Sequence, residues 1–88
     1  MNPRKQMYNL LEKMVECAEK NDKEGVSRLN TEYGQLIPKV YNNPPTELDL
    51  EYDSCRVACV SSVGILVHLH KTLIPDAKQR LSRIPKPN

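Results

Sequence analysis

The sequence contains no tryptophan and no phenylalanine, and its 88 residues include only four tyrosines. A hydrophobic core must therefore be built mainly from aliphatic side chains and methionine. Long apolar runs are also missing, because the longest unbroken one is the stretch Val57–Val60. A membrane-spanning helix needs roughly 20 apolar residues, and the first residues are not followed by the apolar segment of a secretory signal. We therefore expect a cytoplasmic protein without a membrane partner.

Cysteine and glycine are scarce, with three residues of each. An odd number of cysteines does not suit a disulfide framework, so we expect reduced thiols. The glycines stand apart from one another, which excludes a glycine-rich phosphate-binding loop. The 13 basic and 11 acidic residues leave a net charge of +2, which is too small to predict a nucleic-acid partner. The length allows one domain, residues 1–88.

Apolar residues recur at helical spacing in three segments, and no strand-like alternation of comparable length occurs. The first two segments predict helices at about residues 3–20 and 22–41. A short polar turn separates these helices and predicts an antiparallel hairpin. The apolar positions of the hairpin are Met7, Leu11, Met14 and Ala18 in the first helix and Val26, Leu29, Tyr33, Leu36, Ile37 and Val40 in the second.

A third apolar stripe extends from Leu48 to Ile84 and keeps one phase throughout. It predicts a single long helix at about residues 47–84, kinked at Pro75. The expected fold is therefore all-α, with an antiparallel helical hairpin plus a longer third helix in a three-helix bundle. At ~1.5 Å per residue the third helix would be about 57 Å long, and the hairpin would be too short to cover it. The uncovered part predicts a homodimer through this helix.

No group of residues has the spacing of a catalytic or metal site. Cys55 and Cys59 share a helix face, but a structural zinc site needs four ligands, so core packing is the preferred interpretation. His68 and His70 point about 200° apart on a helix and cannot hold one metal ion together. The serines lack a histidine and an acid in a nucleophile arrangement. We therefore expect no enzyme, no metal and no cofactor.

The C-terminal part of the sequence carries its one cluster of like charges. A solvated helix end explains such a cluster most simply, and contact with an acidic protein partner is the functional alternative. Nucleic-acid binding would require aromatic platforms or a recognisable reading helix, and neither is present. The cluster comprises Lys71, Lys78, Arg80, Arg83 and Lys86.

Part of the third stripe has no intramolecular partner in this arrangement, together with apolar residues near the end of the second helix. Such a surface predicts a homodimer seam, a groove for an amphipathic helix of another protein, or both. The expected protein-binding residues are Leu36, Val40, Leu66, Leu69, Leu73, Ile74, Leu81 and Ile84.

Two stretches of the chain resemble a known family. Residues 10–14, the turn 21–26 and residues 32–37 resemble the opening hairpin of the FliT-type flagellar export chaperones. Residues 65–81, with an Ile-Leu pair and then Leu-Ile-Pro, resemble the third helix of that family. Lys23 stands where the family's turn usually carries tryptophan, and without a fourth helix the chain resembles a short form.

The resemblance implies a bacterial cytoplasmic chaperone that acts by binding and not by catalysis. Its client would be the flagellar filament-cap protein, kept competent for type III export, and the export ATPase is a second expected partner. A helix of the client would lie against the protein-binding residues named above. The alternatives are a helical adaptor or regulatory protein that dimerises through the third helix, and a small nucleic-acid-associated protein that uses the basic end.

Overall fold

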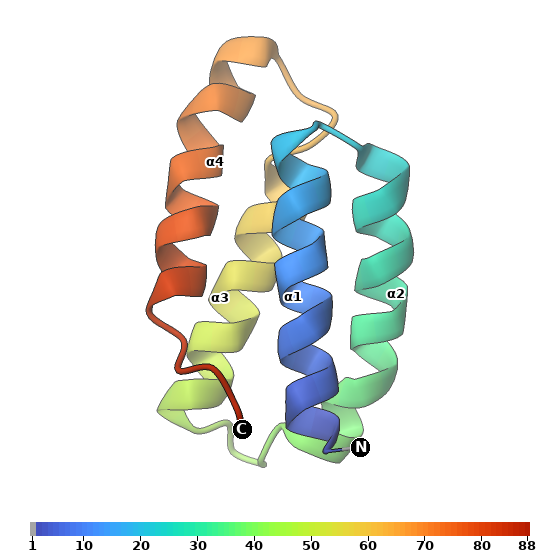
Figure 1. The fold of residues 1–88 in the computed structure, drawn as a ribbon, viewed down its shortest axis with the longest axis vertical. Coiled ribbons are helices and arrows are strands. Elements are labelled where there is room, and N and C mark those ends of the chain that lie inside the picture. The colour runs from blue at the N-terminus through green and yellow to red at the C-terminus, as the bar shows by residue number, and fades with distance from the viewer. Residues whose placement is uncertain (1) are drawn as a thin grey trace.

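A computed structural model describes residues 2–88 of the chain, and these residues form four α-helices (Figure 1). The helices are α1 (Pro3–Glu19), α2 (Lys23–Val40), α3 (Glu47–Ser61) and α4 (Val67–Ser82). The all-α prediction is confirmed, and no strand occurs within residues 2–88. The prediction of three helices is wrong, because the segment expected to form the third helix forms two.

The first two helices begin where the sequence supplies a cap. Asn2 accepts a hydrogen bond from the backbone N–H of Arg4 at 2.8 Å and caps α1. Asp22 accepts one from the backbone N–H of Gly25 at 2.9 Å and caps α2. Between them Asn21 has φ 54°, a left-handed conformation that asparagine tolerates better than most residues. The α1–α2 hairpin therefore follows local rules that can be read along the chain.

α3 begins with a capping box after the proline-rich loop 41–46. Thr46 accepts a hydrogen bond from the backbone N–H of Asp49 at 3.1 Å, and the Asp49 carboxylate accepts one from the backbone N–H of Thr46 at 3.0 Å. These reciprocal bonds satisfy two donors at the helix start. The fully buried carboxylate also accepts hydrogen bonds from the backbone N–H of Asn42 at 2.8 Å and from the Arg4 guanidinium. Asp49 thereby fastens the α2–α3 loop to the start of α1.

The break between α3 and α4 falls at residues 62–66, where the sequence predicted an uninterrupted helix. Gly64 has φ 72°, a conformation that a continuous right-handed helix excludes and that glycine adopts without steric penalty. Its N–H donates to the side-chain oxygen of Asn21 at 3.3 Å, and the His70 ring hydrogen-bonds to the Ser62 carbonyl at 2.7 Å. The chain reverses here, and α4 returns along α3. The apolar periodicity continues across the loop because both helices turn an apolar side toward one core.

The reversal also removes the overhanging helix that the sequence predicted. Pro75, the expected site of a kink, lies inside the shorter helix α4. The longest dimension of the described chain is 35 Å, whereas a helix of residues 47–84 would measure about 57 Å. Within residues 2–88 no helix overhangs the bundle as predicted, so a homodimer would have to use a different surface.

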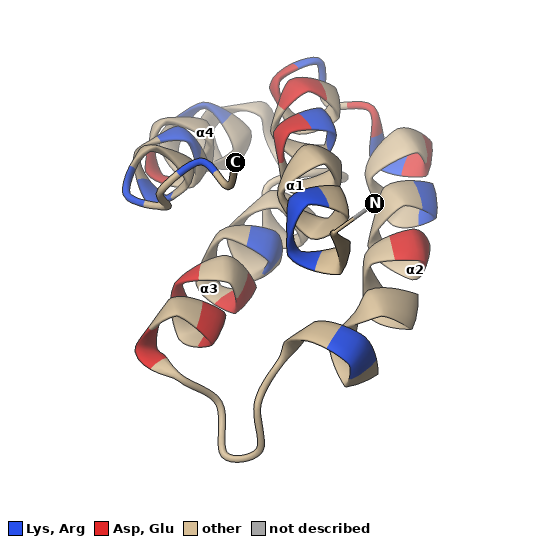
Figure 2. Cartoon of the chain, turned by 60° about the horizontal axis from the view of Figure 1, so that its bottom comes forward, with Lys and Arg blue, Asp and Glu red and all other residues tan. Residues whose placement is uncertain are grey.

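The four helices are arranged with α1 and α3 between the other two. α1 and α3 each contact every other helix, whereas α2 and α4 lie on opposite sides and do not touch (Figures 1 and 2). The buried apolar residues form one cluster: Met7, Tyr8, Leu11, Met14, Val15, Ala18, Val26, Leu29, Tyr33, Tyr52, Cys55, Cys59, Val63, Ala77 and Ile84.

α4 is the least buried of the four helices. Ala77 is the one fully enclosed residue within it, and Ile84, just beyond its end, adds a second contact with the core. Because α4 covers only part of α3, apolar side chains of both helices remain exposed on their shared outer side. Figure 2 shows that the acidic residues of α3 gather at its start.

Candidate partner-binding groove

The outer side of α3 carries aliphatic side chains that the core does not use. Leu50 is 57% exposed and Val57 is 46% exposed, although the same helix buries Tyr52 and Cys55 on its opposite side. A spacing of seven residues is close to two helical turns, so Leu50 and Val57 lie on one side of α3. Ser54 lies between them on that side, and its small side chain leaves a depression.

α4 faces this depression with a stripe of its own. Leu73, Asp76 and Arg80 recur at steps of three and four residues, which places them on one side of the helix, and they line a shallow hollow together with Ser54 and Val57. A second hollow shares Ser54 and Arg80 with the first, so the two adjoin at the hydrogen bond between these side chains and together make up one groove. We call it the α3–α4 groove, and its lining residues are Leu50, Glu51, Ser54, Val57, Ala58, Ser61, Leu73, Asp76, Arg80 and Arg83.

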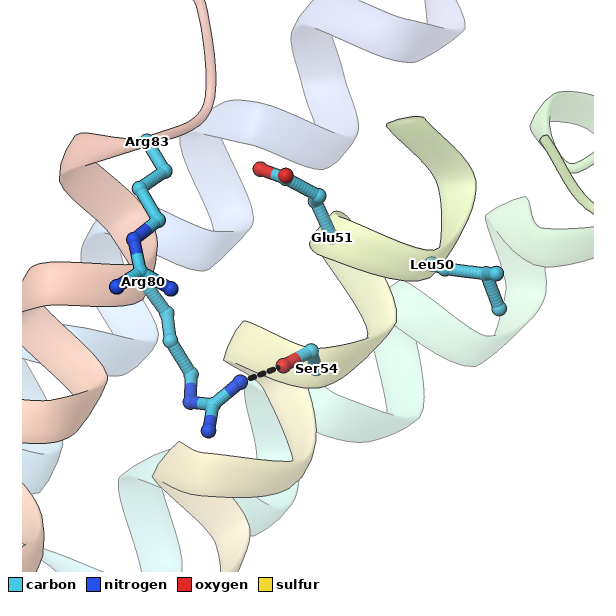
Figure 3. Close-up of a pocket in the computed structure, with 5 residues that line it drawn as sticks. All are labelled: Leu50, Glu51, Ser54, Arg80 and Arg83. Atoms are coloured by element: carbon cyan, nitrogen blue, oxygen red, sulfur yellow. Dashed lines mark hydrogen bonds between the residues drawn. The ribbon is translucent and has the colours of Figure 1, made fainter. Parts of the chain in front are cut away.

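The end of the groove near the start of α3 is polar (Figure 3). Arg80 donates to the Asp76 carboxylate at 2.9 Å and to the Ser54 hydroxyl. The hydrogen bond from Arg80 to Asp76 raises the pKa of Arg80 above its ordinary value, so this guanidinium stays charged. Glu51 and Arg83 line the same hollow from the α3 side and the α4 side (Figure 3). Neither forms an ion pair with a residue of the range 2–88.

The dimensions of the groove suit a helix of about three turns. From Leu50 to Ser61, α3 rises about 16 Å. The two hollows measure about 180 and 370 Å³, much more than the roughly 30 Å³ that one water molecule occupies in the liquid. Ser54, Ala58 and Ser61 are small and allow a second helix to approach closely. The groove can therefore accept the side-chain ridge of another helix.

The structure places three of the eight predicted protein-binding residues on this side of α4. Leu73 lines the groove. Leu66 and Leu69 precede it by seven and four residues, at the end of the bundle where the chain reverses, and they are 66% and 43% exposed. These three residues continue the apolar stripe of α4 from the groove to the tip of the molecule.

The other five predicted residues lie elsewhere and do not join this surface. Leu36 lines a separate hollow between α1 and α2, and Ile74 lines another between α1 and α4. Val40 and Leu81 are half-buried against the core. Ile84 is 4% exposed and belongs to the core itself. The eight residues therefore do not form one continuous patch.

The α3 half of the groove was not predicted from the sequence. Leu50 and Val57 fall outside the stripe of Tyr52, Cys55 and Cys59 that faces the core. The signal was present as two large aliphatic residues, seven apart, on the polar side of an amphipathic helix. These two residues line a groove only because α3 ends at Ser61 and α4 folds back beside it to supply the second wall.

The cysteine pair belongs to the core. Cys55 and Cys59 are fully buried, and Cys17, Cys55 and Cys59 are all free thiols. The hydrogen bond with Cys55, together with burial, raises the pKa of the Cys59 thiol, which keeps it protonated. Within residues 2–88 no group of three or more side chains is placed to hold a metal ion.

A second polar cluster joins α2 to α3. The hydroxyls of Tyr33 and Tyr41 are hydrogen-bonded to each other, and Tyr41 donates to Asp53 at 3.3 Å. Arg56 donates to Asp53 at 2.9 Å and to Asn30 at 3.1 Å. Burial raises the pKa of Tyr33, and it raises the pKa of Tyr41 to about 12, so both hydroxyls stay neutral. None of these side chains has a buried polar atom without a partner, which makes the cluster structural.

Comparisons of the chain with protein-family models, with curated proteins and with solved structures found no match. Across residues 2–88, no helix has the length and apolar character needed to cross a membrane. The candidate functional site is the α3–α4 groove, because its walls carry aliphatic side chains that the core does not use.

Proposed function

We propose that the protein binds an amphipathic helix of a partner protein in the α3–α4 groove. The observation that carries this proposal is the pair of exposed aliphatic side chains on α3, Leu50 and Val57. Val57 lines one hollow with Leu73 of α4, and Leu50 lines the adjoining one. A groove with apolar walls and a polar end is the usual receptor for a helix with apolar residues three, four and seven positions apart. Binding would remove these side chains from water, and the burial would contribute a favourable free energy of about 25 cal/mol per Å² of apolar surface.

The particular function we propose is that of a bacterial flagellar export chaperone. Its client is the filament-cap protein, which it holds in the cytoplasm in a form competent for type III export, and the export ATPase is a second partner. The resemblance of residues 10–37 and 65–81 to FliT-type chaperones supports this proposal. The segment that resembles the family's third helix forms α4 in this structure, and the proposal remains that of a short form of the family.

We propose further that the protein acts without catalysis. The nucleophilic side chains of α3 are unsuited to chemistry, because Cys55 and Cys59 are enclosed in the core. The acid and base that line the groove, Glu51 and Arg83, lie beside apolar residues and hydroxyls with no histidine or cysteine among them. Such a surface can recognise a partner. The Ser54 hydroxyl, which lines the same hollow as Glu51, accepts a hydrogen bond from Arg80 and has no histidine beside it to activate it as a nucleophile.

The experiment is calorimetric titration with the C-terminal helical segment of the filament-cap protein. Val57→Asp should weaken binding by tenfold or more, because it places a charge against the apolar partner. Val60→Asp is the matched control, because Val60 lies on the same helix at 40% exposure but lines a hollow on the α2 side. Leu73→Ala should weaken binding from the opposite wall.

The outcomes separate the function from the placement of the site. If the unaltered protein does not bind this segment, the chaperone proposal fails. If it binds, and Val57→Asp binds as tightly as Val60→Asp, the function stands and the groove is not the site.

A further inference from the structure

Glu51 and Arg83 are an unmatched pair of opposite charges at one end of the α3–α4 groove. Glu51 projects from α3, Arg83 is the C-cap residue of α4, and both line the same hollow (Figure 3). Neither has an ion-pair partner within residues 2–88, whereas their neighbours Asp76 and Arg80 are paired with each other at 2.9 Å. The charges left for an external partner are therefore one acid on the α3 wall and one base on the α4 wall.

This arrangement is self-complementary under a two-fold rotation. An axis that runs along the groove, parallel to the helices, brings α3 of one copy against α4 of the other and keeps every residue at its own level. Glu51 then faces Arg83 of the second copy, and Arg83 faces Glu51 of that copy, which gives two equivalent ion pairs. The aliphatic residues follow the same rule, since Val57 of α3 comes against the Leu73 side of α4. Such an isologous contact is the usual form of a dimer interface.

The same charges argue against partners of a single sign. An acidic peptide would be attracted by Arg83 and repelled by Glu51. The same opposing interactions would act on an anionic membrane or a nucleic acid. A second copy of the chain satisfies both charges without any further requirement on its sequence. Ser54 and Ala58 lie beside Val57 in the groove, and their small size lets two such surfaces approach closely.

We infer that the α3–α4 groove is closed by a second copy of this chain in a two-fold dimer, in which Glu51 of each copy pairs with Arg83 of the other. The inference stands on the geometry of the groove alone. A further consequence rests on the proposed function. The second copy and a client helix would occupy the same surface, so each would exclude the other. Dilution of the protein or an excess of client would then free the groove.

The test is sedimentation equilibrium on the full chain and on two charge-reversal variants. Glu51→Arg and Arg83→Glu should each weaken self-association by roughly tenfold or more, because like charges then face each other at two symmetric positions. An equimolar mixture of the two variants should dimerise again, because each introduced charge meets its opposite on the other chain. Glu16→Arg and Lys39→Glu, exposed positions on α1 and α2, are the matched controls and should dimerise like the unaltered protein.

Each result decides the matter. The inference is overturned if the unaltered chain stays monomeric at high micromolar concentration. It is also overturned if Glu51→Arg and Arg83→Glu each dimerise as tightly as the unaltered chain. A mixture that stays monomeric while both variants keep the helical circular dichroism of the unaltered protein also overturns it. If Glu51 instead paired with Arg83 of its own chain, neither charge reversal would change the oligomeric state, and this result would overturn the inference. A monomer that binds the client helix disproves the dimer alone. A chain that dimerises through the groove but binds no client helix, even when diluted to the monomer, disproves the chaperone alone.

Discussion

The two helical hairpins of this protein differ in how they use their apolar residues. α1 and α2 bury ten residues between them, whereas α3 buries four and α4 buries Ala77 alone. α3 also leaves Leu50 and Val57 exposed to solvent. The α1–α2 hairpin is therefore the stable platform of the fold. The α3–α4 hairpin uses part of its apolar surface to dock on that platform and presents the remainder outward, which is where a binding surface is expected.

The sharpest way to break the platform is to remove a side chain at its centre. Leu11 is fully buried in α1, and Leu11→Ala should lower the free energy of unfolding by about 2–5 kcal/mol, the range for a cavity left in a packed core. Urea unfolding followed by circular dichroism measures the loss. A change below 1 kcal/mol would mean that α1 is not the centre of the core.

A somewhat smaller loss is expected where the two hairpins are fastened together. Asp49→Asn should lower the stability by about 1–3 kcal/mol, because Arg4 loses its charged partner and the backbone donors of Asn42 and Thr46 lose a carboxylate acceptor. Burial opposes ionisation of Asp49, but the hydrogen bonds from Asn42, Thr46 and Arg4 outweigh it and hold the pKa of Asp49 well below its usual range.

The pH dependence of this fastening follows from the lowered pKa. The unfolded carboxyl has a pKa of about 3.9, so the stabilisation by Asp49 is complete above that pH. It declines as the pH falls from there toward the folded pKa, because the unfolded chain binds the proton first. Unfolding experiments at a series of acidic pH values should show a weaker decline for Asp49→Asn than for the unaltered protein, and equal slopes would contradict this assignment.

Substitution of one glycine in each hairpin should change the free energy of unfolding by about 1 kcal/mol, in opposite directions. Gly34 lies within α2, and a β-carbon there would meet nothing within 4 Å, so Gly34→Ala should stabilise the protein by roughly 0.5–1 kcal/mol. Gly64 has φ 72° in the α3–α4 loop, and Gly64→Ala should destabilise it by roughly 1–2 kcal/mol. Thermal melts of both variants give the signs, and two shifts of the same sign would refute the comparison.

The smallest effect is expected on the outward surface itself. Leu69 is 43% exposed on α4, and Leu69→Ala should change the stability by no more than about 0.5 kcal/mol. The same melts measure it beside Leu11→Ala, a substitution of identical chemistry in the platform. A loss as large as that of Leu11→Ala would show that Leu69 supports the core and is not available to a partner.

Most of the fold could be predicted from the sequence because its signals are local. Asn2, Asp22 and Thr46 cap α1, α2 and α3 through residues next to them in the sequence, and the apolar spacing identifies most of the faces that are buried. The break at residues 62–66 could not be predicted in the same way. Ile65 and Leu66 keep the chain apolar through the loop, so Gly64 was the one local sign that it reverses, and a single glycine is tolerated inside many helices.

The groove was harder to predict than the fold because it needs both walls. Leu69 and Leu73 were identified as apolar residues in excess of the core, but a single long helix would place them far from Leu50 and Val57. Only the reversal at Gly64 brings α4 back beside α3, so that Arg80 reaches Ser54. The apolar pattern predicts Ile84 on the surface because it places that residue on an overhanging helix end, whereas in the structure the chain after α4 turns Ile84 into the core.

The carboxylate of Asp49 also has a consequence for the order in which the chain folds. The Arg80–Ser54 bond within the α3–α4 hairpin spans 26 positions, whereas Arg4 and Asp49 are separated by 45 positions. Contacts between distant residues require closure of a long loop and tend to form late. Loss of the Arg4–Asp49 contact should therefore leave the refolding rate nearly unchanged and accelerate unfolding, so that this pair lengthens the lifetime of the native protein once it has formed.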